Sequence, residues 1–108
     1  MAGLSERRAR ILASVYRTFG EAATWTPVAG GSAVPATVRR VVGEAVLNWG
    51  ESEAVVPTLT LRVRVSEVAS PSEGDLVTFG ADLIRLIAEP RLEPLGLEWL
   101  CEAKASAT

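Results

Sequence analysis

Apolar and polar side chains alternate without interruption over residues 58–65. The apolar positions are Leu59, Leu61, Val63 and Val65, and the intervening polar positions are Thr58, Thr60, Arg62 and Arg64. Successive side chains of a β-strand point to opposite faces, so this pattern predicts a half-buried strand. Arg62 and Arg64 then share a polar face, which either is solvated or forms charged contacts with a neighbouring subunit.

The residues after this strand predict more β-structure. A turn-forming cluster is followed by two apolar runs, 76–79 and 83–88, with a short glycine-containing connection between them. Such runs are typical of a hairpin. A further apolar run begins at Leu97, so residues 58–103 are predicted to form a four-stranded β region.

The first part of the chain has a helical period, and residues 4–19 are predicted to form a helix. Its apolar residues fall on one side at helical spacing, namely Leu4, Ile11, Leu12, Val15 and Phe19. Ser5 is suited to cap the start of this helix, and Gly20 is suited to end it. We expect the apolar side to pack across one face or the mouth of the β-structure.

Charged residues are distributed unevenly along the chain. The predicted helix carries the candidate interaction residues Arg7, Arg10 and Arg17. The C-terminal third is acidic and contains Glu89, Glu93, Glu98 and Glu102. This asymmetry suits the stacking of unlike surfaces, with the arginine side of the helix docked on an acidic neighbour.

Residues 22–42 are predicted to form a hairpin. The composition is rich in β-branched residues, and Gly30 and Gly31 mark the turn between the two strands. A glycine pair also occurs in phosphate-binding loops. Neither the Lys-Ser/Thr ending of such a loop nor a following helix is present, so the hairpin is the preferred interpretation.

Residues 43–57 form the least regular stretch, and we expect a long loop there. A connection of this length is uncommon in a small domain unless it has a function. Its candidate interaction residues are Leu47, Trp49, Glu51 and Glu53, which form an apolar anchor in an acidic surround. Trp49 either folds back onto its own core or contacts another subunit.

These elements predict a mainly β fold, either a small antiparallel β-barrel or a sandwich, with one N-terminal α-helix. At 108 residues the chain is long enough for one core, so residues 1–108 are expected to form a single domain. Trp25 and Trp99 alternate within predicted strands and are expected in the core or on a sheet face. Cys101 is the only cysteine and is expected to be a small buried apolar residue.

Composition excludes several classes of function. The formal net charge of −2 argues against a protein that grips a phosphate backbone, although it does not argue against passage of nucleic acid. No apolar stretch approaches the ~20 residues of a membrane helix, so no membrane contact is expected. The N-terminus carries charges where a signal peptide needs an apolar core, and we expect synthesis in a cytoplasm.

Catalytic chemistry is not expected. The chain has no histidine, which removes the commonest general base near neutral pH and the histidine-dependent metal sites. Asp75 and Asp82 are the only aspartates, and both lie in predicted turns, where such side chains usually cap backbone amides. We therefore predict no enzymatic activity, no cofactor and no metal site.

The second half of the chain resembles the small head-tail joining proteins of lambda-like bacteriophages. The resemblance is carried by Pro57-Thr58-Leu59, Leu61-Arg62-Val63-Arg64, Glu67-Val68, Gly74-Asp75-Leu76-Val77, Gly80, Ile84 to Ala88, and Leu97 to Cys101. The order of a helix and a strand pair before these motifs is similar too. Two departures are Leu83-Ile84, where the family often has an aromatic residue, and Glu89 to Pro94, where it often has a Pro-Asp-Gly type turn.

This resemblance implies a structural protein of the virion neck, which forms a homo-oligomeric ring, expected to be hexameric. The implied partners are a portal-side adaptor or head-completion protein on one side and a tail or tail-terminator protein on the other. The ring seals the filled head and docks the tail, and DNA passes through its lumen without specific binding. Two alternatives are a tail-completion or tail-terminator ring protein and a cellular β-barrel adaptor or binding domain.

Overall fold

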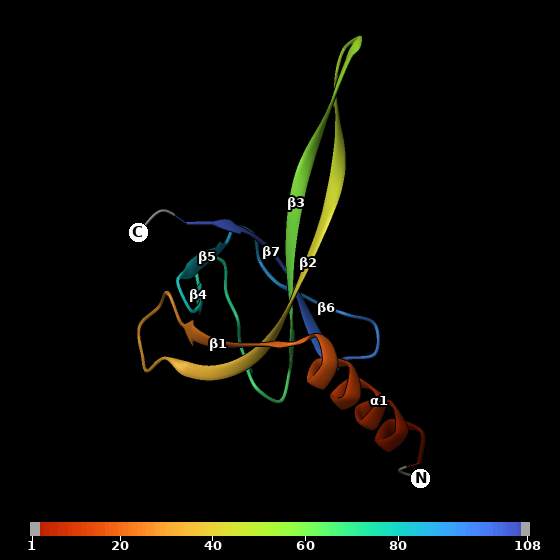
Figure 1. Cartoon of the computed structure of the whole chain (residues 1–108), viewed down its shortest axis with the longest axis vertical. Coiled ribbons are helices and arrows are strands. Elements are labelled where there is room, and N and C mark those ends of the chain that lie inside the picture. The colour runs from red at the N-terminus through yellow and green to blue at the C-terminus, as the bar shows by residue number, and fades with distance from the viewer. Residues whose placement is uncertain (1–2, 107–108) are drawn as a thin grey trace.

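The computed structural model describes residues 3–106, apart from the side chains of Ser5 and Trp49 (Figure 1). The elements are α1 (Gly3–Phe19), β1 (Glu21–Thr26), β2 (Val34–Trp49), β3 (Ser52–Arg64), β4 (Leu76–Phe79), β5 (Asp82–Leu86), β6 (Arg91–Leu92) and β7 (Glu98–Ala105). The single helix at the N-terminus of the described chain confirms the predicted helix. The predicted cap falls on the side chain of Ser5, which is outside the described part.

Six of the described strands form a closed antiparallel barrel. Neighbouring strands follow the order β3-β2-β1-β4-β5-β7, and β7 pairs with β3 to close the ring. β6 adds two residues beside β7. The structure thus confirms the mainly β fold with one helix, and it selects the barrel over the sandwich. Closure removes the free edges that an open sheet of this size would expose.

The barrel interior is filled by alternate residues of its strands. Leu61 and Val63 of β3 are fully buried, as their alternation predicts. Trp25 is buried and Trp99 packs against the core, which confirms the expected placement of both. Cys101 is fully buried, and this burial raises the pKa of its thiol to about 12. No helix within residues 3–106 is long and apolar enough to cross a membrane.

Asp75 links two turns to the barrel wall. Its carboxylate accepts hydrogen bonds from Trp25 Nε1, Val28 N and Ser72 N, each at 2.9 Å. The predicted capping role is therefore confirmed for Asp75. Asp82 differs, because its carboxylate pairs with the Arg40 guanidinium at 3.1 Å instead of capping an amide.

The prediction of a long loop at residues 43–57 is wrong, because β2 and β3 continue through this segment as a regular hairpin. Val46 faces Val55 in the register, and Trp49 faces Ser52 across a turn at Gly50 and Glu51. Gly50 has a φ of +61°, a left-handed conformation that favours glycine. The period of two is not visible in the sequence of residues 43–57, because this hairpin carries apolar residues on both faces.

Residues 41–58 of this hairpin are called the arm here. β1 pairs with β2 only at residues 34–38, and β7 pairs with β3 only at residues 59–64. The strands of the arm therefore pair with each other alone. Figure 1 shows the arm projecting from the barrel at one end of the long axis, with α1 at the other end. The predicted hairpin at 22–42 is present only in part, since its second strand runs on into the arm.

Candidate interaction surfaces

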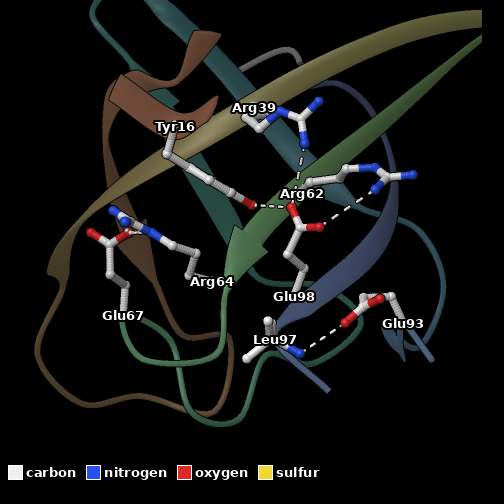
Figure 2. Close-up of polar contacts among 8 residues, drawn as sticks. All are labelled: Tyr16, Arg39, Arg62, Arg64, Glu67, Glu93, Leu97 and Glu98. Carbon is white, nitrogen blue, oxygen red and sulfur yellow. Dashed lines mark hydrogen bonds and ion pairs between the residues drawn. The ribbon is translucent and has the colours of Figure 1, made fainter. Parts of the chain in front are cut away.

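A buried carboxylate holds α1 against the barrel. Tyr16 of α1 donates a hydrogen bond from its hydroxyl to Glu98 Oε1 of β7 at 2.7 Å (Figure 2). Arg39 Nη1 lies 3.4 Å from the same oxygen, and Arg62 Nη1 lies 3.5 Å from Oε2. Glu98 is only 6% exposed. A carboxylate in such a place is tolerated because two cations and one hydroxyl compensate for its lost hydration.

Tyr16 is enclosed on several sides. Burial raises the pKa of its hydroxyl above the usual value, and the hydrogen bond to Glu98 and the charge of that carboxylate raise it further. The guanidinium groups of Arg64 and Arg39 lie 4.7 Å and 5.6 Å from the centre of its ring. The neutral hydroxyl is thus the donor, and Tyr16 anchors the helix in a fixed orientation.

Arg62 and Arg64, expected either on a solvated face or in charged contact with a neighbouring subunit, form ion pairs within the subunit and keep 37% and 26% of their side-chain surface exposed. Arg62 pairs with Glu98, and Arg64 Nη2 lies 2.9 Å from Glu67 Oε2. Glu67 also accepts a hydrogen bond from Thr37 N at 3.1 Å. Both arginines are engaged inside the subunit because the barrel and the following turn bring carboxylates to them, which the strand pattern alone does not show.

The apolar side of α1 is largely uncovered. Leu4, Ile11 and Phe19 are 59–67% exposed, whereas Tyr16 is 1% exposed. Residues of a helix are spaced about 100° apart, so Tyr16 points roughly 140° away from Ile11. The helix meets the barrel through Tyr16, so Leu4 and Ile11 are turned outward, whereas Leu12 and Val15 of the predicted apolar side are half-buried. The expected packing of that side on the β-structure is wrong for the three exposed residues.

A groove runs between α1 and the segment that precedes β7. It has a volume of about 180 Å³ and is lined by Arg8, Ile11, Leu12, Val15, Glu93, Leu95, Leu97 and Glu98. Glu93 accepts hydrogen bonds from Leu95 N at 3.0 Å and Leu97 N at 2.8 Å. These bonds, chiefly the one from Leu97, lower the pKa of Glu93. The groove is therefore mainly apolar, and its acidic residues are already engaged within the subunit.

The arm exposes apolar side chains on both faces. Val42, Val46 and Val55 share one face and are 55–76% exposed. Leu47 lies on the other face and is 42% exposed. Exposed apolar side chains gathered on one element are a feature of many interaction sites. The arm is thus a candidate interaction surface, because its own subunit leaves these apolar side chains uncovered.

The acidic residues of the arm accompany these apolar positions. The arm contains Glu44, Glu51 and Glu53 and no lysine or arginine. Glu44 and Glu53 share the face of Val46 by the strand register. The predicted residues Leu47, Glu51 and Glu53 are therefore exposed on one element, while the side chain of Trp49 lies outside the described residues.

The predicted candidates do not form a single site. Leu47, Glu51 and Glu53 lie on the arm, whereas Arg7, Arg10 and Arg17 are exposed on α1 at the opposite end of the molecule. Sequence reasoning missed three exposed valines of the arm, Val42, Val46 and Val55. Apolar residues of this segment fall on both faces of the hairpin, so no clear period of two marked these valines in the sequence.

One further finding bears on the chemistry. Within residues 3–106, no group of three or more His, Cys, Asp or Glu side chains is arranged to hold a metal ion.

The acidic C-terminal third exposes fewer carboxylates than its sequence suggests. Glu98 is buried and Glu93 is hydrogen-bonded to backbone amides, which leaves Glu89 and Glu102 as its exposed carboxylates.

Comparison with known proteins places the chain among proteins of one kind. A family model described as Phage Head-Tail Attachment protein matches residues 3–103. The match extends from the start of α1 into β7, so it includes the barrel, the arm and the helix anchor. No curated protein matches the chain.

Proposed function

The chain belongs to the phage head-tail attachment family, and from this premise we propose that it is a structural connector that joins the DNA-filled head to the tail. The observation that carries the proposal is the family match over nearly the whole described chain. In this role residues 1–108 work as one joining domain in the neck of the virion, and no catalysis is involved.

We further propose that the connector acts as a homo-oligomeric ring, with six copies as the resemblance to joining proteins implies. Its support is the location of the exposed apolar surfaces, since the arm and α1 lie at opposite ends of the subunit. Two different surfaces that meet head to tail generate a ring when the rotation closes. The net charge of −2 suits a lumen through which DNA passes without being held.

The partners above and below the ring are a portal-side adaptor or head-completion protein and a tail or tail-terminator protein. Arg10 and Arg17 are exposed on α1 and offer a basic surface to an acidic neighbour. In isolation we expect a folded monomer that associates weakly, because the described chain has no long helix or heptad seam to drive strong self-association.

Electron microscopy of particles assembled without this protein tests the proposal. We expect filled heads and separate tails, and we expect purified protein to bind the filled heads and restore joining. Binding to tails instead, together with tails of abnormal length, would support the tail-terminator alternative. A protein that binds neither heads nor tails would contradict the connector role and favour the cellular adaptor.

A further inference from the structure

We propose that the arm of one copy lies against the outward side of α1 of the next copy, and that this contact is the repeating interface of the ring. The contact joins the Val42, Val46 and Val55 face of the arm to the groove beside α1. This inference rests on the proposed ring and adds to it the identity of the two surfaces that meet. Its occupant is a second copy of this chain.

The arm supplies an apolar strip with acidic residues beside it. Val46 and Val55 are directly opposed in the register, and Val42 follows on the same face. All three are more than half exposed. Glu44 and Glu53 lie on this face, so an apolar partner that meets it must also place positive charge next to the valines.

The outward side of α1 supplies the matching chemistry. Ile11 lies on the groove and is 60% exposed, and Leu95 on the opposite wall is 54% exposed. At about 100° per residue, Arg7 and Arg8 flank Ile11 within about 60° on either side. An apolar strand pair laid on Ile11 and Leu95 would therefore place its carboxylates near two arginines.

Net charge agrees with this pairing. The arm has three glutamates and no basic residue, while α1 has four arginines and one glutamate. Opposite charges steer association and disfavour arm-to-arm or helix-to-helix contacts between copies. The complementarity is thus between unlike surfaces, as a head-to-tail ring requires.

The contact cannot form within one subunit. The molecule is 53 Å long, and Figure 1 shows the arm and α1 at opposite ends of that axis. The arm therefore reaches α1 only when another copy supplies it. Each copy offers one arm and one helix, so the same contact repeats from copy to copy until the ring closes.

Cysteine cross-linking in joined particles tests the contact directly. A variant with Ile11→Cys and Val46→Cys, treated with a short bismaleimide, should give covalent ladders of two or more copies. Both positions are more than half exposed, and the native Cys101 is fully buried. The matched control is Glu6→Cys with Val46→Cys, because Glu6 lies about 140° from Ile11 on the same end of α1. The control should give no ladder.

Charge exchange gives a second test with internal rescue. Arg7→Glu with Arg8→Glu makes the helix acidic, and Glu44→Lys with Glu53→Lys makes the arm basic. Each variant alone should lower the yield of joined particles about tenfold or more, because like charges then meet. An equal mixture should recover joining, since copies can alternate around a ring of even number. Arg10→Glu with Arg17→Glu carries the same charge change on another side of α1. Added to the Ile11→Cys and Val46→Cys variant, it should leave the cross-linked ladder intact, whereas Arg7→Glu with Arg8→Glu in the same background should abolish it.

The outcomes separate this inference from the proposed function. Normal joining without arm-to-helix ladders overturns the inference and leaves the connector role standing. Cross-linking of Val46→Cys to a head or tail protein instead of to a second copy also overturns it. A wild-type protein that fails to bind filled heads contradicts the proposed function. In that case the free Ile11→Cys and Val46→Cys variant is cross-linked at high concentration, and the absence of a ladder rejects the arm-to-helix contact as well.

Discussion

The hydroxyl of Tyr16 on α1 donates a 2.7 Å hydrogen bond to the buried carboxylate of Glu98 on β7, 82 residues away in the sequence. This pair determines which side of the helix meets the barrel. It thereby turns Ile11 outward, where this side chain is available to a partner. One polar contact in the interior thus decides the composition of an exterior surface.

Replacing Tyr16 with phenylalanine tests this anchor. Tyr16→Phe keeps the ring between Arg39 and Arg64 but removes the donor to Glu98. We expect the free energy of unfolding to fall by about 1–2 kcal/mol, the usual cost of losing a buried hydrogen bond to a charged group. Urea unfolding measures the change. An unchanged midpoint of urea unfolding would show that Arg39 and Arg62 alone compensate for the burial of the Glu98 carboxylate.

Stability should decline at alkaline pH through the same residue. The pKa of Tyr16 is raised in the folded protein above its ordinary value of 10.0, so the folded state retains a proton that the unfolded state loses. This contribution is complete below pH 10 and is lost as the pH rises through the folded-state pKa. Thermal unfolding measured from pH 8 to pH 11 should show the decline, and Tyr16→Phe should make it shallower, with the remainder due to the buried Cys101 thiol, whose pKa is raised to about 12. Equal slopes for the two proteins would contradict this assignment.

Substitutions at Leu47 and Trp49 of the arm should separate folding from assembly. Leu47→Ala and Trp49→Ala change residues outside the barrel, so we expect the free energy of unfolding to change by no more than about 0.5 kcal/mol. Joining of heads to tails should nevertheless decrease, because we expect these two residues to contact a neighbouring protein in the assembly. Val63→Ala is the matched control. Shortening this fully buried side chain should lower the free energy of unfolding, which Leu47→Ala and Trp49→Ala should not do. Normal joining by the Trp49→Ala variant would show that Trp49 does not contribute to the interface.

Reversing the charge of the exposed residues Arg10 and Arg17 of α1 should slow joining without unfolding the domain. Arg10 and Arg17 are exposed, so Arg10→Glu with Arg17→Glu should leave the Tm nearly unchanged. Charges at the rim of an interface mainly change association rates, and the effect should be larger at low salt. The measurement is the rate of head-to-tail joining in a mixing assay. A normal rate at low salt would show that this side of the helix is merely solvated.

The residues that could be predicted from the sequence are those whose environment follows from their own neighbours. The alternation at residues 58–65 placed Leu61 and Val63 in the core, because a strand with one buried face shows its period directly. Asp75 was placed correctly for a similar reason, since an aspartate in a turn caps amides a few residues away. The strand content and the N-terminal helix are properties of this local kind.

Only the tertiary structure decided the arm and the helix anchor. Residues 43–57 lack a clear period of two because both of their faces are apolar, and their strand pairing depends on a register that the opposite strand supplies. Arg62 and Tyr16 meet Glu98 because closure of the barrel joins β3 to β7 and brings α1 alongside. Contacts between distant segments depend on how the chain closes on itself, so the periodicity of any one segment could not reveal them.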